Sequence, residues 1–533
     1  MAIAKISSGS PRRSIGFARS LPDAPAVELF KDRGYDCYLL TDQSAAQAGT
    51  LEKTDSIVLS YRKEKPSELG DLRRFAYVLN YDCRIYLRYE SDLATKKKVI
   101  KTIDLLKLPV DGLQQAEMAN FSSDWFDPYA PPFGPYLHVR TADDDWTKLA
   151  NLIVANPAGH PPNPSLTIKP KSVVKKLLSA ESVLLLRRAF ADCSSVELFQ
   201  KTDGLSGVLA FEVFAHIRDK VSGAKSPYRC FIKLGPRLKV AREYDKYRTI
   251  AMEKVPFHLG PRLRLDRCML GQSQGIITCD FVAGAEPIRD CVKAGRGIHA
   301  LGNLFNQTLI AWRRDAEPEQ QSLNKLLVNY LADREEVPKH RKKRIKDFGA
   351  KRSLAELIQR IQKSPLGQRV LIGTIHGDLH ATNVLVRMGD AIIIDLENIA
   401  TAKPLLLDAA SLEAGLFIDG FVGDKRTGRS VLKSVLPYYT RDALTKDDHF
   451  CDPADKSVWF IDSIRQIRMQ SKQMELGEFQ YAWTLVAVFL RKSLNKENLD
   501  KITKPAEGLT REDVRALAYV LAEKMIMTLS NSA

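Results

Sequence analysis

The stretch that most constrains this chain is residues 372–399, IGTIHGDLHATNVLVRMGDAIIIDLENI. Two short aliphatic runs, residues 384–386 and 391–394, predict a buried strand pair joined by a Met-Gly-Asp turn. A polar loop, HGDLHATN, precedes the first strand, and an acidic residue follows the second. Polar groups at the ends of paired strands can meet at one point. We therefore expect three polar side chains to converge: Asp378, Asn383 and Asp395.

These residue types at this spacing suit phosphoryl transfer. One carboxylate orients the attacking hydroxyl and accepts its proton, while an amide oxygen and a second carboxylate hold Mg2+ on the phosphates. The catalytic loop of protein kinases has the pattern H-x-D-x-x-x-x-N, with a metal-binding Asp after the next hairpin. Here His376, Asp378 and Asn383 reproduce that pattern, and Asp395 follows at the expected strand end. The alternative is a tight polar turn between two core strands, but the full pattern is far more restrictive than HGD alone.

The same motif, with Asp-Leu-Glu in place of Asp-Phe-Gly, resembles the aminoglycoside phosphotransferase and choline kinase family, which has the protein-kinase-like fold. The resemblance covers about residues 195–420 and implies a bilobal α+β domain that uses ATP and Mg2+. Helical patterns continue beyond it to the C-terminus. Neither an Ala-Pro-Glu motif nor a long activation segment follows, which points away from the activation-loop control of protein kinases.

Roles for individual loop residues follow from the resemblance. Asp378 would be the general base, and Asn383 and Asp395 would be the metal ligands. His376 would brace the loop, and His380 is a candidate accessory group.

The cation expected to hold the α- and β-phosphates is Lys233, which ends the apolar strand Cys-Phe-Ile-Lys. Glu243 follows ten residues later, in the second turn of a helix predicted over residues 239–255. A Glu at this place would pair with the lysine and fix its geometry. The alternative is a pair of unrelated surface charges.

Two backbone segments complete the implied nucleotide site. A DGLSG loop between two predicted strands would close its N–H groups over phosphates, although by itself it is an ordinary hairpin turn. The stretch GIITCDFVAG resembles the family's hinge, where a backbone carbonyl and a backbone N–H read the adenine edge. The residues concerned are Gly204, Ser206 and Gly207 of the loop, and Asp280 and Val282 of the hinge.

The region before the kinase-like segment alternates predicted strands and helices, which favours a parallel α/β sheet. We interpret it as a Rossmann-like domain of flavodoxin or TIR type with a regulatory or docking role. It contains neither GxGxxG nor GxxxxGK[ST], so dinucleotide and P-loop binding have no support. The predicted domains are residues 1–165 for this module, 166–285 for linker helices and the kinase-like N-lobe, and 286–533 for the C-lobe with its C-terminal helices. The Pro-rich stretch that begins at His160, with Pro170 shortly after it, is interpreted as the linker.

Length and composition are typical of a cytoplasmic multidomain protein. The chain has 533 residues, and no apolar run approaches the 18 or so that a membrane span requires. The N-terminus lacks the continuous apolar core of a signal peptide. The eight cysteines form no CxxC pair, so neither a zinc site nor a disulfide framework is indicated.

A net charge of +16 favours anionic partners and argues against a cationic aminoglycoside as acceptor. Residues 339–352 include eight Lys or Arg among fourteen positions. Such a run would suit a phosphate-bearing acceptor, an acidic protein or nucleic acid. The alternative is a solvated helix face with no specific partner.

Together these features predict a phosphotransferase that uses ATP and Mg2+ and transfers a phosphoryl group to a hydroxyl acceptor, anionic or macromolecular in nature. One alternative is a nucleotide-binding pseudokinase or scaffold in a multi-component signalling or defence system. Another is a nucleic-acid-linked protein that uses the basic run. The combination with a Rossmann-like domain is similar to ternary-complex-associated kinase-like domains of bacterial signalling or conflict systems.

Overall fold

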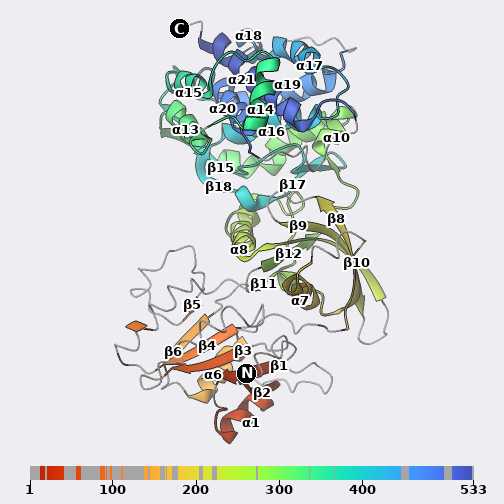
Figure 1. Ribbon diagram of the computed structural model, residues 1–533, viewed down its shortest axis with the longest axis vertical. Helices are drawn as coiled ribbons and strands as arrows, with labels where there is room; N and C mark the ends of the chain where they lie inside the picture. Colours follow the sequence, from red (N-terminus) through yellow and green to blue (C-terminus); the bar gives the residue numbers. More distant parts are fainter. Residues whose placement is uncertain are drawn as a thin grey trace. The chain divides into compact units, whose positions relative to one another are not determined.

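The computed structural model describes residues 13–18, 21–40, 56–61, 84–89, 92, 97–98, 110–111, 137–141, 145–155, 163, 165–170, 178–202, 208–218, 225–271, 274–334, 336–364, 366–445, 455–496 and 507–530. The chain divides into two compact units (Figure 1). Unit 1 is Met1–Asp245 with Arg262–Phe281, and unit 2 is Lys246–Pro261 with Val282–Ala533. The three domain ranges expected from the sequence stay a prediction.

Unit 1 begins with a parallel sheet. Its elements are β1 (Arg13–Ala18), α1 (Ala24–Asp32), β2 (Tyr35–Leu40), β3 (Ser56–Tyr61), β4 (Arg84–Tyr89), β5 (Val110–Asp111), β6 (Leu137–Thr141) and α6 (Trp146–Ala155). The strand order is β2-β1-β3-β4-β6-β5, and every pair is parallel. Ile15, Phe17 and Tyr86 of the strands are buried with Phe30 and Ile153 of the helices.

The parallel sheet predicted for this region is therefore present. Aliphatic and aromatic strands of this kind need cover on the sheet faces, and amphipathic helices such as α1 and α6 provide it. The sequence pattern also predicts helices over residues 68–79 and 94–106, but the first and most of the second lie outside the described residues. The flavodoxin- or TIR-like subtype stays a prediction.

A second sheet in unit 1 is almost wholly antiparallel. Its elements are β7 (Thr167–Pro170), α7 (Ala180–Ala189), β8 (Cys193–Thr202), β9 (Leu209–Arg218), β10 (Lys225–Pro236), α8 (Arg237–Lys246), η4 (Leu265–Arg267), β11 (Met269–Leu270) and β12 (Gln274–Asp280). The order is β11-β12-β10-β9-β8-β7, with only β7 parallel to its neighbour. Helix α7 packs Leu185 and Leu186 against Phe211 and Ile232 of the sheet. Pro170, which we expected in the linker, ends β7, because an edge strand tolerates a residue without an N–H donor.

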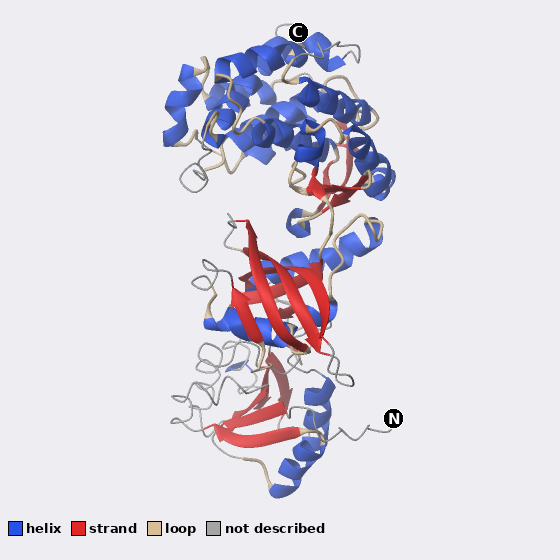
Figure 2. Ribbon diagram, turned by 90° about the vertical axis from the view of Figure 1, so that its right-hand side faces the viewer, coloured by secondary structure: helices blue, strands red, loops and turns tan. Residues whose placement is uncertain are grey.

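Unit 2 is mostly helical, and its short strands gather along one edge of the helices (Figure 2). Its elements are η3 (Tyr247–Ala251), α9 (Met252–Lys254), β13 (Glu286–Pro287), α10 (Ile288–Lys293), α11 (Ile298–Asn303), η5 (Leu304–Thr308), α12 (Ile310–Arg314), β14 (Glu317–Gln320), α13 (Leu323–Leu331), α14 (Lys339–Asp347), α15 (Leu354–Gln362), β15 (Arg369–Ile375), β16 (Val384–Arg387), β17 (Asp390–Ile393), η6 (Leu396–Asn398), β18 (Ala400–Pro404), α16 (Leu406–Gly420), α17 (Gly428–Val435), η7 (Leu436–Tyr439), α18 (Arg441–Thr445), α19 (Val458–Lys472), α20 (Gln480–Ser493) and α21 (Arg511–Ser530). Helices α16, α20 and α21 pack together and are buried almost all round. Within the described part of the chain, no helix is both long and apolar enough to cross a membrane.

The predicted strand pair is the hairpin of β16 and β17, whose register pairs Val384 with Ile393. Its turn places Met388 and Gly389 at φ values of 53° and 89°. Two successive residues in the left-handed region match the twist of the strands, which is why tight hairpins use them. The hairpin sets the path of the polar loop before β16 and of the acidic residue after β17.

The basic run does not form one exposed patch, and the expectation of such a patch is wrong at Arg341. This side chain is fully buried in α14 and donates from Nε and Nη2 to the two carboxylate oxygens of Glu512, at 2.7 and 2.8 Å. Arg344 pairs with Asp513 at 3.0 Å. The reason is helical periodicity, because Arg341 lies on the same inward face as the buried Ile345.

We predict that Arg341→Ala lowers the free energy of unfolding by about 3–5 kcal/mol, because Glu512 would be left as a buried charge without its bidentate partner. Lys343→Ala, at an exposed position of the same helix, is the control and should change it by about 0.5 kcal/mol or less. Urea unfolding measures both. Equal effects of the two substitutions would show that the pair is not a structural element.

Candidate active site

The polar loop is held by one buried carboxylate, Asp408, in the first turn of α16. Its Oδ2 accepts the backbone N–H of His376 at 2.7 Å, and its Oδ1 accepts the N–H of Gly377 at 3.1 Å. Asp408 is only 4% exposed. Burial raises its pKa to about 6, against the opposing effects of His376 and of the two amide donors. Each carboxylate oxygen therefore fixes one peptide group at the point where the loop leaves β15.

Gly377 makes the bend that turns the chain from β15 into the loop. Its φ is +77°, a left-handed conformation that costs little only for glycine. A Cβ built on this residue would collide with the backbone carbonyl oxygen of Asn398. The glycine of the HGD motif is thus required by space as well as by conformation.

His376 is fully buried and ties the loop to the end of β17. Its Nε2 lies 2.9 Å from the carbonyl oxygen of Ile394, which can only accept, so Nε2 carries the proton and donates it. Ile394 directly precedes Asp395 in the chain. His376 thus links the start of the loop to the strand end that precedes Asp395, and its role in catalysis stays a prediction.

Asn383 connects the predicted base with the predicted metal ligand. The side-chain Nδ2 of Asn383 donates to the backbone oxygen of Asp378 at 3.1 Å. The backbone carbonyl oxygen of Asn383 accepts the N–H of Ile394 at 2.9 Å. With the amide nitrogen used in this way, the side-chain oxygen is the atom that can face a cation. The carboxylate of Asp378 is 43% exposed, so an incoming hydroxyl could reach it.

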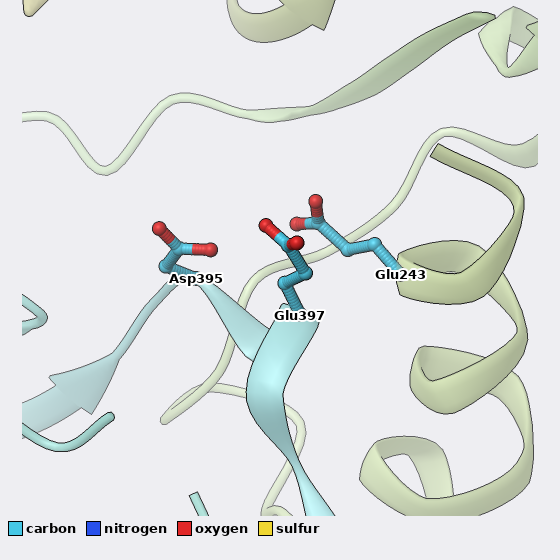
Figure 3. Close-up of side chains that lie close together, drawn as sticks. All are labelled: Glu243, Asp395 and Glu397. Atoms are coloured by element: carbon cyan, nitrogen blue, oxygen red, sulfur yellow. The ribbon is translucent and has the colours of Figure 1, made fainter. Parts of the chain in front are cut away.

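Asp395 follows β17 in a left-handed conformation, with φ of 64°. Figure 3 shows its carboxylate and that of Glu397 projecting to the same side of the chain, and it also labels Glu243 of α8. Carboxylate oxygens of Asp395 and Glu397 lie within 4.8 Å of each other. The donors that these two side chains offer are oxygens, as is the side-chain carbonyl of Asn383, and oxygen ligands are those that Mg2+ prefers. No role was predicted for Glu397 from the sequence, although it stands in the Asp-Leu-Glu signature.

Two basic side chains lie near the predicted base, one from a distant helix and one from the loop itself. Lys492 of α20 places its Nζ 3.7 Å from Oδ1 of Asp378, and His380 places its Nε2 3.7 Å from Oδ2. Asp419, at the end of α16, lies near His380 and pairs with Arg511. Burial raises the pKa of Asp419, but the charges of Arg511, His380 and Lys492 outweigh it and lower the pKa overall. No local sequence signal could have identified Lys492, since it follows Asp378 by more than a hundred residues.

In unit 1, Lys233 and Glu243 form the pair expected between β10 and α8. Lys233 Nζ donates to Glu243 Oε1 at 2.7 Å, and the two side chains are 15% and 13% exposed. Asp280 ends β12 at the predicted hinge, and its N–H donates to the carbonyl of Arg262. The boundary between the units falls between Phe281 and Val282. The predicted phosphate loop, with Gly204, Ser206 and Gly207, lies outside the described residues.

We predict that Gly377→Ala both destabilises the protein and abolishes any activity of the loop. The left-handed conformation alone costs an alanine about 1–2 kcal/mol, and the collision with Asn398 adds to it. Gly389→Ala is a matched control, because Gly389 has a φ of +89° and no atom near the added Cβ. Thermal unfolding of both variants should show a larger loss for Gly377→Ala, and equal losses would contradict the collision.

We also predict a pH signature of Asp408. An unfolded carboxyl ionises near pH 3.9, before the folded one at about 6, so the contribution of Asp408 to the free energy of unfolding falls as pH rises from 4 to 6. The full change is at most about 3 kcal/mol. The stability of the parent relative to Asp408→Asn should therefore be higher at pH 4 than at pH 7. A relative stability that instead increases with pH would show that the pKa is not raised.

No protein-family model and no curated protein matches the chain. Solved structures are similar to it. An aminoglycoside phosphotransferase, a thermostable mutant of APH(4)-Ia in its apo form, has 12% identity and a TM-score of 0.34 over 63% of this chain and 95% of its own. A glucosamine kinase in complex with glucosamine, ADP and inorganic phosphate has 12% identity and a TM-score of 0.32 over 63% and 94%. APH(3'')-Id from Streptomyces rimosus has 16% identity and a TM-score of 0.26 over 53% and 96%.

Proposed function

We propose that this protein is a phosphotransferase that uses ATP and Mg2+ and transfers a phosphoryl group to the hydroxyl of an acceptor. The observation that carries the proposal is the construction of the loop. The side chain of Asp378 is 43% exposed, while the backbone on both sides of it is fixed by contacts of Asp408, His376 and Asn383. Such preorganisation is costly to build and is the main requirement of phosphoryl transfer, which depends on positioning and charge more than on covalent chemistry.

Asp378 would act on the acceptor. Its carboxylate would accept the hydroxyl proton while the acceptor oxygen forms a bond to the γ-phosphorus. The bond between that phosphorus and the β,γ-bridging oxygen breaks, and ADP leaves. Because Asn383 holds the backbone carbonyl of Asp378, the base keeps its position through this exchange.

The remaining site residues would hold the nucleotide. Lys233, oriented by Glu243, would contact the α- and β-phosphates, as the sequence pattern predicts. Backbone groups of Gly204, Ser206 and Gly207 would cover the phosphates, and those of Asp280 and Val282 would meet the adenine. Asn383 and Asp395 would hold Mg2+, with Glu397 as a further oxygen ligand. When bound, the ion offsets the negative charge of the phosphates.

Within this proposal the parallel sheet of unit 1 is a flavodoxin- or TIR-like regulatory or docking module. Its support is the strand order, since β2-β1-β3-β4 is the beginning of the flavodoxin-type order 2-1-3-4-5. We do not extend the proposal to nucleic acid or an acidic protein bound by residues 339–352. Arg341 and Arg344 of that run are committed to carboxylates of α21.

The test is ATP turnover by the full chain with a panel of hydroxyl acceptors and with water. Asp378→Asn should lower kcat by about 100-fold or more, because it removes the general base. Asp395→Asn should have a comparable effect that high Mg2+ partly relieves. Asp390→Asn, at the start of β17, is the control acidic residue and should leave turnover unchanged.

Two outcomes would overturn the assignment. If Asp378→Asn and Asp395→Asn both match the parent with every acceptor, the loop is not the catalytic site. If the parent binds ATP in calorimetry but neither hydrolyses nor transfers its phosphate, the protein is a nucleotide-binding scaffold instead.

A further inference from the structure

A pocket of about 390 Å³ opens among the helices of unit 2, beside α15. Its lining residues come from α15 and the turns on either side of it, from α20 and from α21, and all but the tryptophan are polar: Arg352, Glu356, Gln359, Arg360, Lys363, Ser364, Trp483 and Ser530. Pockets that hold small organic ligands begin at about 300 Å³. This pocket therefore has room for a small organic molecule and not only for a single ion.

The pattern of α15 explains why cations line this pocket. Leu354, Leu357 and Ile361 form the buried face of the helix, which packs against α13 and α21. Arg360 and Lys363 are three residues apart, and residues at this spacing lie on the same side of a helix. Both line the pocket, so their two positive charges face the same space.

These two cations are not committed to a carboxylate. Among the residues that the structure describes, neither Arg360 nor Lys363 forms an ion pair or a side-chain hydrogen bond. Arg352 differs from them, because it lies 3.6 Å from Glu523. The two oxygens of Glu523 also accept the backbone N–H of Lys351. Like charges that face one pocket repel each other, and an anion bound between them offsets the repulsion.

The carboxylate in the pocket wall, Glu356, serves the start of α15. Its Oε2 accepts the backbone N–H of Ser353 at 2.8 Å and the Ser353 hydroxyl at 3.1 Å, as part of a capping box. These hydrogen bonds lower the pKa of Glu356, and the charges of Arg352 and Arg360 lower it further. Arg360 thus acts on Glu356 electrostatically without forming an ion pair with it, and its N–H donors stay available to a ligand.

Helix α20 separates the pocket from the proposed active site. Trp483, near the start of α20, lines the pocket, whereas Lys492, near its end, lies beside Asp378. The two residues are nine positions apart, which in an α-helix is a rise of about 13 Å and about two and a half turns. They therefore point to opposite sides of α20, and a ligand in the pocket occupies a different place from an acceptor at Asp378.

We propose that this pocket binds a small phosphate-bearing compound at a site separate from the proposed active site. Arg360 and Lys363 bind the phosphate, which carries about 1.5–2 negative charges at neutral pH and so matches two uncommitted cations. Gln359 and Ser530 offer further hydrogen-bond donors. A carboxylate carries a single charge and binds more weakly. The site does not depend on whether the loop around Asp378 transfers phosphate.

Calorimetry on the full chain, without nucleotide or Mg2+, measures binding of three probes: inorganic phosphate, glycerol 3-phosphate and acetate. The parent should bind both phosphate compounds at least about tenfold more tightly than acetate, the size expected for one additional charge-assisted hydrogen bond. Arg360→Gln and Lys363→Gln should each weaken phosphate binding by about tenfold, for the same reason. Lys363→Arg keeps the charge and should keep most of the affinity.

Two further variants distinguish the pocket from the general charge of the surface. Lys351→Gln removes an exposed lysine that lies just before α15 and does not line the pocket, and it should bind phosphate like the parent. Glu356→Gln keeps the capping box, which accepts Gln at this position, but removes the carboxylate from the wall. This variant should bind phosphate about twofold to fivefold more tightly.

The proposed site is overturned if the parent shows no saturable binding of phosphate, or if it binds acetate as tightly. It is also overturned if Lys351→Gln weakens binding as much as Arg360→Gln does, because the anion would then respond only to overall charge. A third contrary result is loss of binding in Lys233→Gln with no loss in the two pocket variants, since phosphate would then occupy the proposed nucleotide site.

Discussion

The whole site depends on the two hydrogen bonds that Asp408 accepts from the backbone of His376 and Gly377. The Asp408 side chain, which belongs to helix α16, thereby accepts two backbone N–H groups at the start of the polar loop that no neighbouring strand pairs with. The anchor is strong because Asp408 and His376 are buried, and it is sensitive because burial opposes the charge that makes the carboxylate an effective acceptor. With the start of the loop fixed in this way, hydrogen bonds of His376 and Asn383 hold the rest of the loop against the ends of β16 and β17.

Buried charge is a recurring element of unit 2. Arg468 forms a bidentate pair with Glu413, and Tyr481 donates to the same carboxylate at 2.7 Å. Arg341 and Glu512 form a second fully buried pair. Such pairs contribute little net stability compared with apolar packing, but they fix the orientation of the helices that carry them. Helix orientation matters here because α20 and α21 bring Lys492 and Arg511 to the surroundings of Asp378.

Much of the fold could be predicted from local pattern. The aliphatic runs of β16 and β17, the glycine in their turn and the alternation of the N-terminal elements were all readable, because period and turn chemistry act over a few residues. The contact between Lys233 and Glu243 was also predictable, since both lie in adjacent elements at a short spacing. The basic run was misread at Arg341, because composition does not say which face of a helix is covered.

By itself the sequence determined the local geometry of the loop: a glycine where the chain must bend, a histidine and an asparagine at fixed offsets from Asp378, and an acidic residue at the next strand end. Only the tertiary structure decided what surrounds that loop. Lys492 and Arg511 come from helices more than a hundred residues away from Asp378 in the chain, and their approach depends on how α16, α20 and α21 pack. The physical reason is range, because backbone conformation follows from neighbouring residues, whereas the electrostatic field at a site is the sum of charges that folding brings together.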